Sequence, residues 1–416
     1  MKKGYFSISS FLAAMLLSCG VVSATESVMV AEAETATITG NAVAEEMAEA
    51  TATAEVAAAE VGEIQYVEYQ SRLELSGHLV GSWMDGFFME GKNRTNLNQL
   101  MVSAERALDT STGFDWGYNL DVTFGTENAQ CYGDGEFDGS WGVSGDGYCT
   151  SIYQIYAEVG YYDMSLKIGK FSTIVGYESF DETEELFNTH SYMYEYEPMT
   201  HCGGLLTWDA TEKFSLNFGL TTGCDNSFEN PNGDFGVLFG ASYQVTDRLS
   251  VGYAAMWNRV HGEERSAVNF AYYDIFGGHD GLYAHDKDEF QQTVTVSWDI
   301  TCRLNYTFTC NVGSMVFEDQ HNVAHSHVGL GNYFTYILTD KVTLGLRYEW
   351  FHQEIGGGNF GYDADFDDAN YHELTLAAKY MPTENIFVRP EIRYDWVEEG
   401  TRDSGFSGGV GFGLMF

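Results

Sequence analysis

The sequence contains few basic residues and few prolines for its length. Among its 416 residues, 20 are Lys or Arg and 61 are Asp or Glu, which gives a formal net charge of −41. This balance argues against nucleic acid as a partner, because phosphate binding needs basic patches. Only four prolines accompany 46 glycines and 15% aromatic residues. That composition favours strands and tight turns over helices.

Long hydrophobic runs are also missing. Beyond the amino-terminal segment no stretch of 18 or more apolar residues occurs, so no transmembrane helix is expected. A membrane β-barrel needs no such run, because only every second residue of its strands faces lipid. Pairs of cysteines with CxxC spacing are absent as well, which argues against a zinc ribbon or a redox site. We predict no metal site and no cofactor.

The first 24 residues have the order of a secretory signal peptide. Lys2 and Lys3 precede the apolar stretch "FLAAMLLSCGVV", and small residues end at Ala24. An alternative is a lipoprotein cut before Cys19, at "LLSC", which would leave a lipidated first residue. Residues 25–71 are rich in Ala and Glu and hold no Lys or Arg, which predicts an acidic periplasmic segment, disordered or weakly helical. Export permits disulfides, and Cys131 and Cys149 flank one Gly/Asp-rich loop, so we predict a bridge between them.

From residue 72 to residue 416 the hydrophobic pattern has a period of two. In "FDWGYNLDVTF", which starts at Phe114, aromatic and aliphatic residues alternate with small and polar ones. The chain ends in the same way, on "GGVGFGLMF", with Phe416 on the apolar face. Short turns and long loops alternate along this region, seven of the first and eight of the second, which predicts 16 antiparallel strands in an up-and-down transmembrane β-barrel. Pro390 within a strand demands a bulge or an altered register, and Asn332 falls on the lipid face, so 14 or 18 strands remain open.

Two stretches resemble a known family. They are "LKIGKFSTIVGYESFD" (166–181) and "EPMTHCGGLLTW" (197–208), which carry Gly169-Lys170-Phe171, Gly176, Glu178 and Pro198 to His201. The family is that of OmpL-like outer-membrane β-barrel porins. The terminal Phe416 is similar to the carboxy-terminal signal that the barrel assembly machinery reads. The resemblance implies a bacterial outer-membrane location, passive solute passage and no enzymatic activity, since the family has no shared catalytic residues.

Charged residues gather at two places where a pore would be shaped. The third long loop, 172–198, is acidic. Several strands carry charged residues at the alternate positions whose side chains are expected to face the lumen. In 16-stranded porins the third loop folds inward, so by analogy this loop is the candidate constriction. Its acidic residues are Glu178, Asp181, Glu182, Glu184, Glu185, Glu195 and Glu197. The candidate lumen wall is Lys167, Arg347, Glu349, Arg389, Glu391, Arg393 and Asp395.

These charges have two interpretations. An acidic loop facing an arginine wall would narrow the pore and favour cations, or the charges would pair and stiffen the wall. The loop could instead be a solvated outer loop. The sequence therefore predicts a porin for small hydrophilic solutes and ions, with outer-membrane lipid and the barrel assembly machinery as partners, and it is compatible with a homotrimer. The alternative is a structural or adhesive barrel that acts through its acidic segment or surface loops. Whether the third loop or the acidic segment closes the pore stays open.

Overall fold

A closed antiparallel β-barrel accounts for almost all regular structure in the computed structural model. The structure describes residues 73–86, 94–127, 148–225, 228, 230, 233–261, 287–317, 323–355, 369–398 and 404–416. The predicted signal peptide, the acidic segment and Cys131 lie outside these residues. Among the residues described, no helix has the length and apolar character needed to cross a membrane.

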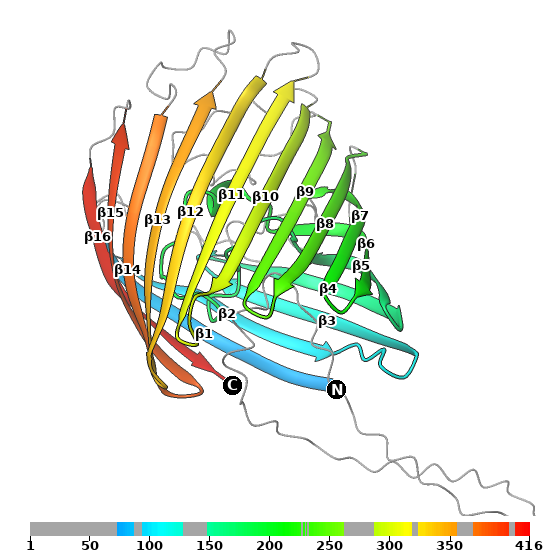
Figure 1. Cartoon of the computed structure of the whole chain (residues 1–416), viewed down its shortest axis with the longest axis horizontal. Coiled ribbons are helices and arrows are strands. Elements are labelled where there is room, and N and C mark those ends of the chain that lie inside the picture. The colour runs from blue at the N-terminus through cyan, green and yellow to red at the C-terminus, as the bar shows by residue number, and fades with distance from the viewer. Residues whose placement is uncertain are drawn as a thin grey trace, which may run out of the picture. The chain divides into compact units, whose positions relative to one another are not determined.

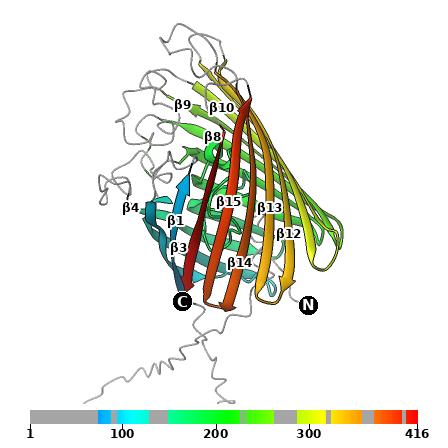
Figure 2. The ribbon, with the colours of Figure 1, turned by 90° about the vertical axis from the view of Figure 1, so that its left-hand side faces the viewer.

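Sixteen strands form the barrel, as the alternation of loop lengths predicted (Figures 1 and 2). Each strand pairs with its neighbours in the chain, and β1 pairs with β16 to close the ring, so the sheet has no open edge. The strands are β1 (Leu73–Gly86), β2 (Arg94–Arg106), β3 (Phe114–Gly125), β4 (Cys149–Tyr161), β5 (Met164–Ser172), β6 (Thr200–Thr211), β7 (Phe214–Cys224), β8 (Phe235–Thr246), β9 (Leu249–Val260), β10 (Lys287–Asp299), β11 (Leu304–Phe317), β12 (Val323–Thr339), β13 (Val342–Ile355), β14 (Ala369–Thr383), β15 (Ile386–Glu398) and β16 (Gly405–Met415). One short 3-10 helix, η5 (Tyr194–Tyr196), lies between β5 and β6.

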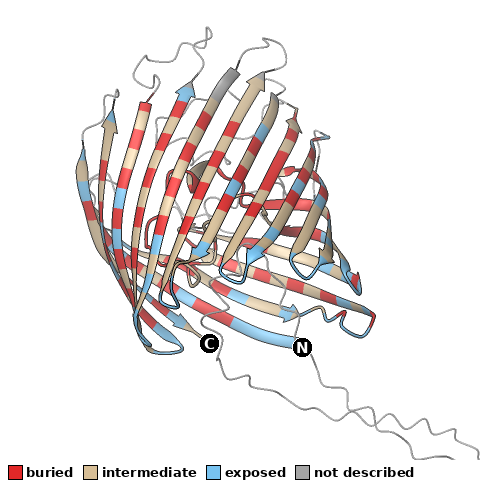
Figure 3. Cartoon of the chain, viewed as in Figure 1, coloured by how far each residue is buried: buried red, intermediate tan, exposed pale blue. Residues whose placement is uncertain are grey.

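The outward face of the barrel is apolar and the inward face is polar. On β3 the side chains of Phe114 and Trp116 are exposed, whereas Asn119 and Asp121 are buried inside. Figure 3 shows the same alternation of buried and exposed residues on many strands. This arrangement suits a barrel in lipid, because the closed ladders pair backbone groups of neighbouring strands and the apolar rows face the hydrocarbon.

The register at Pro390 differs from the expectation. No bulge occurs there, because Ala377 lies opposite Glu391 and Tyr380 lies opposite Val388, which is the same register on both sides of the proline. The ladder merely lacks pairs between these two positions, as expected of a residue without an N–H. The bulge predicted at Pro390 was therefore wrong, and the register shift of this ladder falls between Tyr380 and Thr383.

Asn332 does lie on the outward parity of β12, and a neighbouring strand satisfies it. The hydroxyl of Tyr306 on β11 donates a hydrogen bond of 2.8 Å to Asn332 Oδ1. The polar group thus has a partner on the outer face and requires no change in the number of strands.

The terminal phenylalanine takes part in barrel closure. The N–H of Gly77 donates to the carbonyl of Phe416, and the N–H of Phe416 donates to the carbonyl of Gly77, both at 2.8 Å. The Phe416 ring also covers Gly77, where an added Cβ would lie 2.7 Å from the ring. The last residue therefore joins the first and last strands through its backbone as well as through its side chain.

Deleting Phe416 is expected to weaken closure more than replacing its side chain. The deletion removes two backbone hydrogen bonds, with a net loss on the order of 2 kcal/mol of unfolding free energy. Phe416→Ala keeps both bonds and removes only the ring, so it is expected to retain most stability of the refolded barrel in denaturant titrations. Equal unfolding midpoints for the deletion and the wild type would contradict the role of these bonds.

Candidate pore constriction

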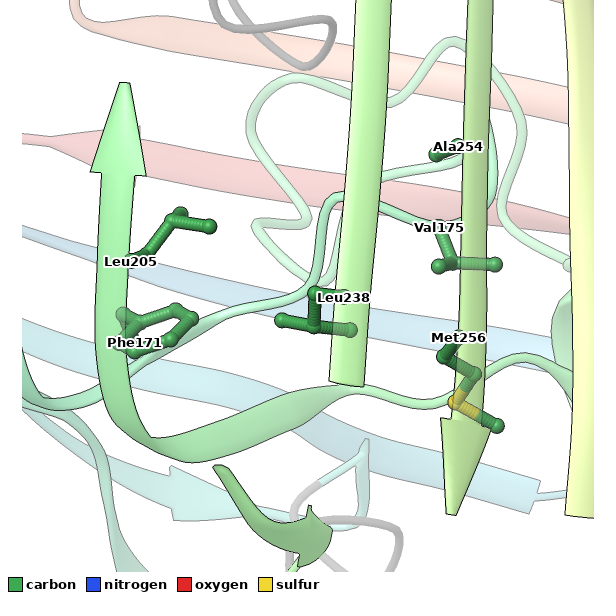
Figure 4. Close-up of a cluster of buried hydrophobic side chains, with 6 residues drawn as sticks. All are labelled: Phe171, Val175, Leu205, Leu238, Ala254 and Met256. Atoms are coloured by element: carbon green, nitrogen blue, oxygen red, sulfur yellow. The ribbon is translucent and has the colours of Figure 1, made fainter. Parts of the chain in front are cut away.

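The connection between β5 and β6, residues 173–199, runs inside the barrel and is called the third loop below. Figures 1 and 2 show it within the ring of strands in two perpendicular views. Its first part is fixed by an apolar cluster in which Val175 packs against the inner wall (Figure 4). Burying each aliphatic or aromatic side chain of such a cluster contributes about 1.5–3 kcal/mol. The cluster consists of Phe171, Val175, Leu205, Leu238, Ala254 and Met256.

A second anchor joins the loop to β2 and β4. The ring of Phe180 stacks on Tyr153 with 4.2 Å between the ring centroids. Gln99 on β2 donates from its amide to the carbonyl of Phe180 at 2.9 Å and accepts from the N–H of Glu182 at 3.1 Å. One side-chain amide thus satisfies two backbone groups of the loop.

Two basic side chains on β14 and β15 hold the next part of the loop. Arg389 donates to the Glu182 carboxylate at 2.5 Å and to the carbonyls of Glu182 and Glu185 at 3.1 and 2.9 Å. Lys379 donates to the carbonyls of Thr183 and Glu185 at 2.5 and 3.0 Å. Both cations are buried, so the loop covers them.

Arg347 on β13 connects the loop to the wall through carboxylates of both. Its guanidinium donates to Glu178 of the loop at 2.9 Å and to the carbonyl of Thr189 at 2.7 Å. On the other side it forms a very short hydrogen bond with Glu373 of β14. Arg393 on β15 repeats the pattern, because it donates to the carbonyl of His190 at 2.6 Å and pairs with its neighbour on the strand, Asp395.

Carboxylates on the wall accept hydrogen bonds from the loop backbone. Glu349 accepts from the N–H groups of Tyr192 and Met193 at 2.6 and 2.7 Å, and Glu391 accepts from the N–H of Asn188 at 2.5 Å. An irregular segment buried in protein must find partners for its peptide groups, because it has no ladder of its own. The charged wall supplies these partners.

The end of the third loop reaches the opposite strands. Tyr196 donates from its hydroxyl to Gln353 on β13 at 2.6 Å, and its carbonyl accepts from Gln291 on β10 at 2.7 Å. Glu197 accepts from the amide of Asn311 on β11 at 2.8 Å. The loop therefore contacts strands around most of the circumference rather than one side of the lumen.

Burial and neighbouring charges shift the acidic residues of the loop in opposite directions. Burial acts to raise the pKa of Glu178, but the charges of Arg347 and His190 outweigh it and lower this pKa from 4.5 to about 2. Burial, reinforced by the charge of Glu178, raises the pKa of Glu197 to about 8. Burial and the same charge raise the pKa of Glu185 to about 7. The loop thus contains ionised and protonated carboxyl groups side by side near neutral pH.

A recess of about 170 Å³ remains beside the loop on the β2–β4 side of the lumen. Within the described part of the chain, its lining contains no Lys or Arg. Tyr153, Gln154 and Met101 contribute the wall side. The carboxyl groups that line it are Asp121, Glu178, Asp181, Glu184 and Glu197.

The structure brings most of the predicted site residues together, but not all. Glu178 of the loop pairs with Arg347, and Glu182 pairs with Arg389. The other predicted wall residues, Glu349, Glu391, Arg393 and Asp395, contact Tyr192, Asn188, His190 and Tyr192 of the loop, respectively. Asp181, Glu184 and Glu197 line the recess, and the carbonyl of Glu185 accepts from Lys379 and Arg389. Lys167 faces the lumen elsewhere, over the ring of Tyr156 at 4.6 Å from its centroid. Glu195 is half-buried in η5. Cys149 is buried at the start of β4, and the predicted bridge to Cys131 lies outside the described residues.

Sequence reasoning missed the uncharged side chains that dock the loop, among them Gln99 and Asn311 on the wall and Asn188 in the loop itself. One signal for the docking surface is present in the sequence, namely glycines with inward parity. A Cβ at Gly329 would lie 2.1 Å from the Met193 side chain, and one at Gly411 would lie 2.1 Å from Asn188. Inward glycines therefore mark where the loop approaches the wall closely.

The sequence of this chain matches the model of one protein family. The family model described as "Putative beta-barrel porin-2, OmpL-like" matches residues 71–414, which confirms the resemblance found in the motifs. No curated protein matches the chain in sequence.

Solved structures similar to this chain are outer-membrane barrels. One is OmpT with loop L8 deleted, an outer membrane protein of Vibrio cholerae, with 14% identity, 83% of this chain and 99% of that chain covered, and a TM-score of 0.56. Another is OmpF of Salmonella typhi in complex with daunomycin, with 14% identity, coverage of 83% and 97%, and a TM-score of 0.56. A third is an anion-selective porin from Comamonas acidovorans, with 10% identity, coverage of 83% and 99%, and a TM-score of 0.54. At these identities the likeness shows the fold.

Proposed function

Because the chain belongs to the family of OmpL-like β-barrel porins, we propose that it is an outer-membrane channel for passive diffusion of small hydrophilic solutes and ions. The observation that carries this function is a closed 16-strand barrel with a polar interior into which the third loop folds. Such an interior holds water and lets charged side chains set selectivity. The channel acts by diffusion and not as an enzyme.

The third loop is the constriction in this proposal, and the remaining passage favours cations. The arginines of the wall are buried beneath the loop and paired with carboxylates, so their charge is not presented to the lumen. The recess beside the loop is lined by acidic side chains instead. A negative lining of a narrow passage raises the local cation concentration and excludes anions.

Single-channel recording in a planar lipid bilayer tests the function. Purified, heat-modifiable protein is expected to give stable conductance steps, and a salt gradient is expected to give a reversal potential of cationic sign. Conductance steps without ion selectivity would contradict the proposed cation preference but would still support a channel. If folded protein shows no conductance, the channel function is wrong.

Asp181→Asn is expected to lower the ratio of cation to anion permeability. Asp181 lines the recess, and its side chain is 29% exposed. A unit charge about 4 Å away contributes roughly 1 kcal/mol in water, which corresponds to a change of up to about fivefold in local cation concentration. Asp340→Asn, at the exposed turn between β12 and β13, is the matched control and is expected to leave the reversal potential unchanged. Equal shifts for both variants would rule out the recess as the selective region.

A structural or adhesive barrel is the second candidate. The contacts of the third loop around the wall favour it, because they narrow the lumen from several sides. In that case the acidic segment or surface loops would carry the function. A cellular phenotype that is lost on deletion of residues 25–71 but survives blockage of the lumen would support it.

Assembly and export complete the proposal. Exposed aromatic and aliphatic rows on the outer face suit contact with outer-membrane lipid. The barrel assembly machinery is the proposed reader of Phe416, the signal peptide ends at Ala24, and residues 25–71 form a periplasmic segment. A homotrimer in detergent, measured by light scattering, is the expected oligomeric state; OmpT of Vibrio cholerae has been solved in a trimer form.

A further inference from the structure

Three potential metal ligands from two different loops meet inside the barrel mouth. Glu127 follows β3, whereas Glu182 and His190 belong to the third loop. One ligand atom from each lies within 4.8 Å of the other two. Glu182 and His190 are buried and Glu127 is half-buried.

The imidazole of His190 is held in one orientation. Its Nδ1 makes a 2.9 Å hydrogen bond with Glu178, and its ring stacks on Tyr194 with 3.7 Å between centroids. Glu178 is itself fixed by Arg347 and by the hydroxyl of Tyr333. The opposite ring nitrogen, Nε2, therefore faces Glu182 Oε1 at 3.8 Å. A carboxylate behind a histidine in this way is the usual support of a metal-binding imidazole.

The carboxylate of Glu182 provides an independent observation. Its Oε2 accepts from Arg389 at 2.5 Å, but its Oε1 has no hydrogen-bond partner among the described residues, although the side chain is only 1% exposed. A buried carboxylate oxygen without a partner is costly. A cation between Glu182, His190 and Glu127 would satisfy it.

We propose that Glu127, Glu182 and His190 form a binding site for a divalent transition-metal ion of the Zn²⁺ class, which links the loop after β3 to the third loop. One imidazole nitrogen and two carboxylate oxygens suit Zn²⁺ and leave a fourth position for water. Two ligand atoms on one tetrahedral Zn²⁺ lie roughly 3.3 Å apart, so the ligand atoms would move together by up to about 1.5 Å on binding. Ca²⁺ and Mg²⁺ prefer oxygen ligands alone, and the imidazole disfavours them. The site does not depend on whether the barrel conducts.

Calorimetric titration of Zn²⁺ into metal-stripped, folded full-length protein tests the site. One site per chain is expected, and Glu127→Gln is expected to weaken it by at least about tenfold, because it removes a ligand without touching the contacts that dock the third loop. Glu184→Gln replaces a carboxyl group of the third loop outside the cluster and is expected to bind Zn²⁺ as the wild type does. Heat-modifiable migration checks that each variant is folded.

Absorption spectroscopy at the zinc edge gives a readout that needs no variant. The Zn²⁺-loaded protein is expected to show one imidazole and oxygen ligands. The proposed site would be wrong if the spectrum showed sulfur ligands or two or more imidazoles. It would also be wrong if the wild type bound no Zn²⁺, or if Glu127→Gln bound Zn²⁺ with the same affinity as the wild type. Bilayer recording plays no part in either readout, so failure of the channel function leaves this result unaffected.

Discussion

Arg347→Met is expected to release the third loop from the wall and to raise the single-channel conductance. The guanidinium of Arg347 holds Glu178 of the loop and Glu373 of β14, and it also donates to the carbonyl of Thr189. Without it, two buried carboxylates face each other and a peptide carbonyl loses its donor. Removing one partner of a buried ion pair costs about 3–5 kcal/mol. Since about 1.4 kcal/mol corresponds to a factor of ten, the docked state should lose about two to four orders of magnitude in population relative to the undocked state.

The matched control is Arg259→Met. Arg259 pairs with Asp288 at 3.0 Å, but both side chains are more than a third exposed. Pairs of this kind contribute about 0–1 kcal/mol, so conductance and stability should stay near the wild-type values. Limited proteolysis of the loop gives a second readout, with faster cleavage expected only in Arg347→Met. A folded Arg347→Met barrel with wild-type conductance and wild-type cleavage would show that other contacts suffice to hold the loop.

The barrel could be predicted from the sequence because its causes are local. A period of two fixes which face of each strand meets lipid, and the lengths of connections fix the order of the strands. Arg347, Arg389 and Arg393 were assigned to the lumen on parity alone, and all three are buried inside. The bulge expected at Pro390 failed because a strand can lose one donor without changing its register.

The partners within the lumen could not be predicted in the same way. Arg347 and Glu178 are 169 residues apart, and Arg389 and Glu182 are 207 apart, so no sequence pattern links them. Parity says that a side chain points inward but not how far a loop extends to meet it. The neutral partner Gln99 carries no charge that would single it out, although it serves two backbone groups of the loop. Glycines at inward-facing strand positions can be recognised in the sequence, but the sequence does not show which loop residue packs against each of them.

Docking of the third loop is expected to weaken as the pH rises, with Glu197 and His190 as the main causes. Burial acts to lower the pKa of His190, but the hydrogen bond and the charge of Glu178 outweigh it and raise this pKa from 6.5 to about 10. Glu197 sits at the end of the loop and lies against its start, since an added Cβ at Gly176 would be 2.2 Å from Glu197 Oε2. Burial, with the charge of Glu178, raises the pKa of Glu197 to about 8, while Asn311 and His190 act in the other direction. The docked loop therefore binds a proton more tightly than the undocked loop, in which the pKa returns toward 4.5.

The sign follows from this difference. The contribution of Glu197 to docking is largest below pH 4.5, falls by about 1.4 kcal/mol per pH unit between 4.5 and 8, and is constant above 8. Between pH 6 and pH 9 this contribution falls by on the order of 3 kcal/mol. Conductance recorded across this range is expected to rise with pH. Glu185, whose pKa burial raises to about 7, acts in the same direction.

Glu197→Gln separates this effect from a general response of the barrel to pH. Glutamine keeps an oxygen that can accept from Asn311 and stays neutral at every pH, so the docked loop of the variant should be more stable at pH 9 than that of the wild type. Its conductance should change less between pH 6 and pH 9 than that of the wild type, with the remainder due to His190, Glu184 and Glu185. A variant that opens with pH as strongly as the wild type would place the titrating group elsewhere. A wild type whose conductance falls with pH would mean that the docked loop prefers the ionised carboxylate, which its burial among Glu178 and apolar side chains opposes.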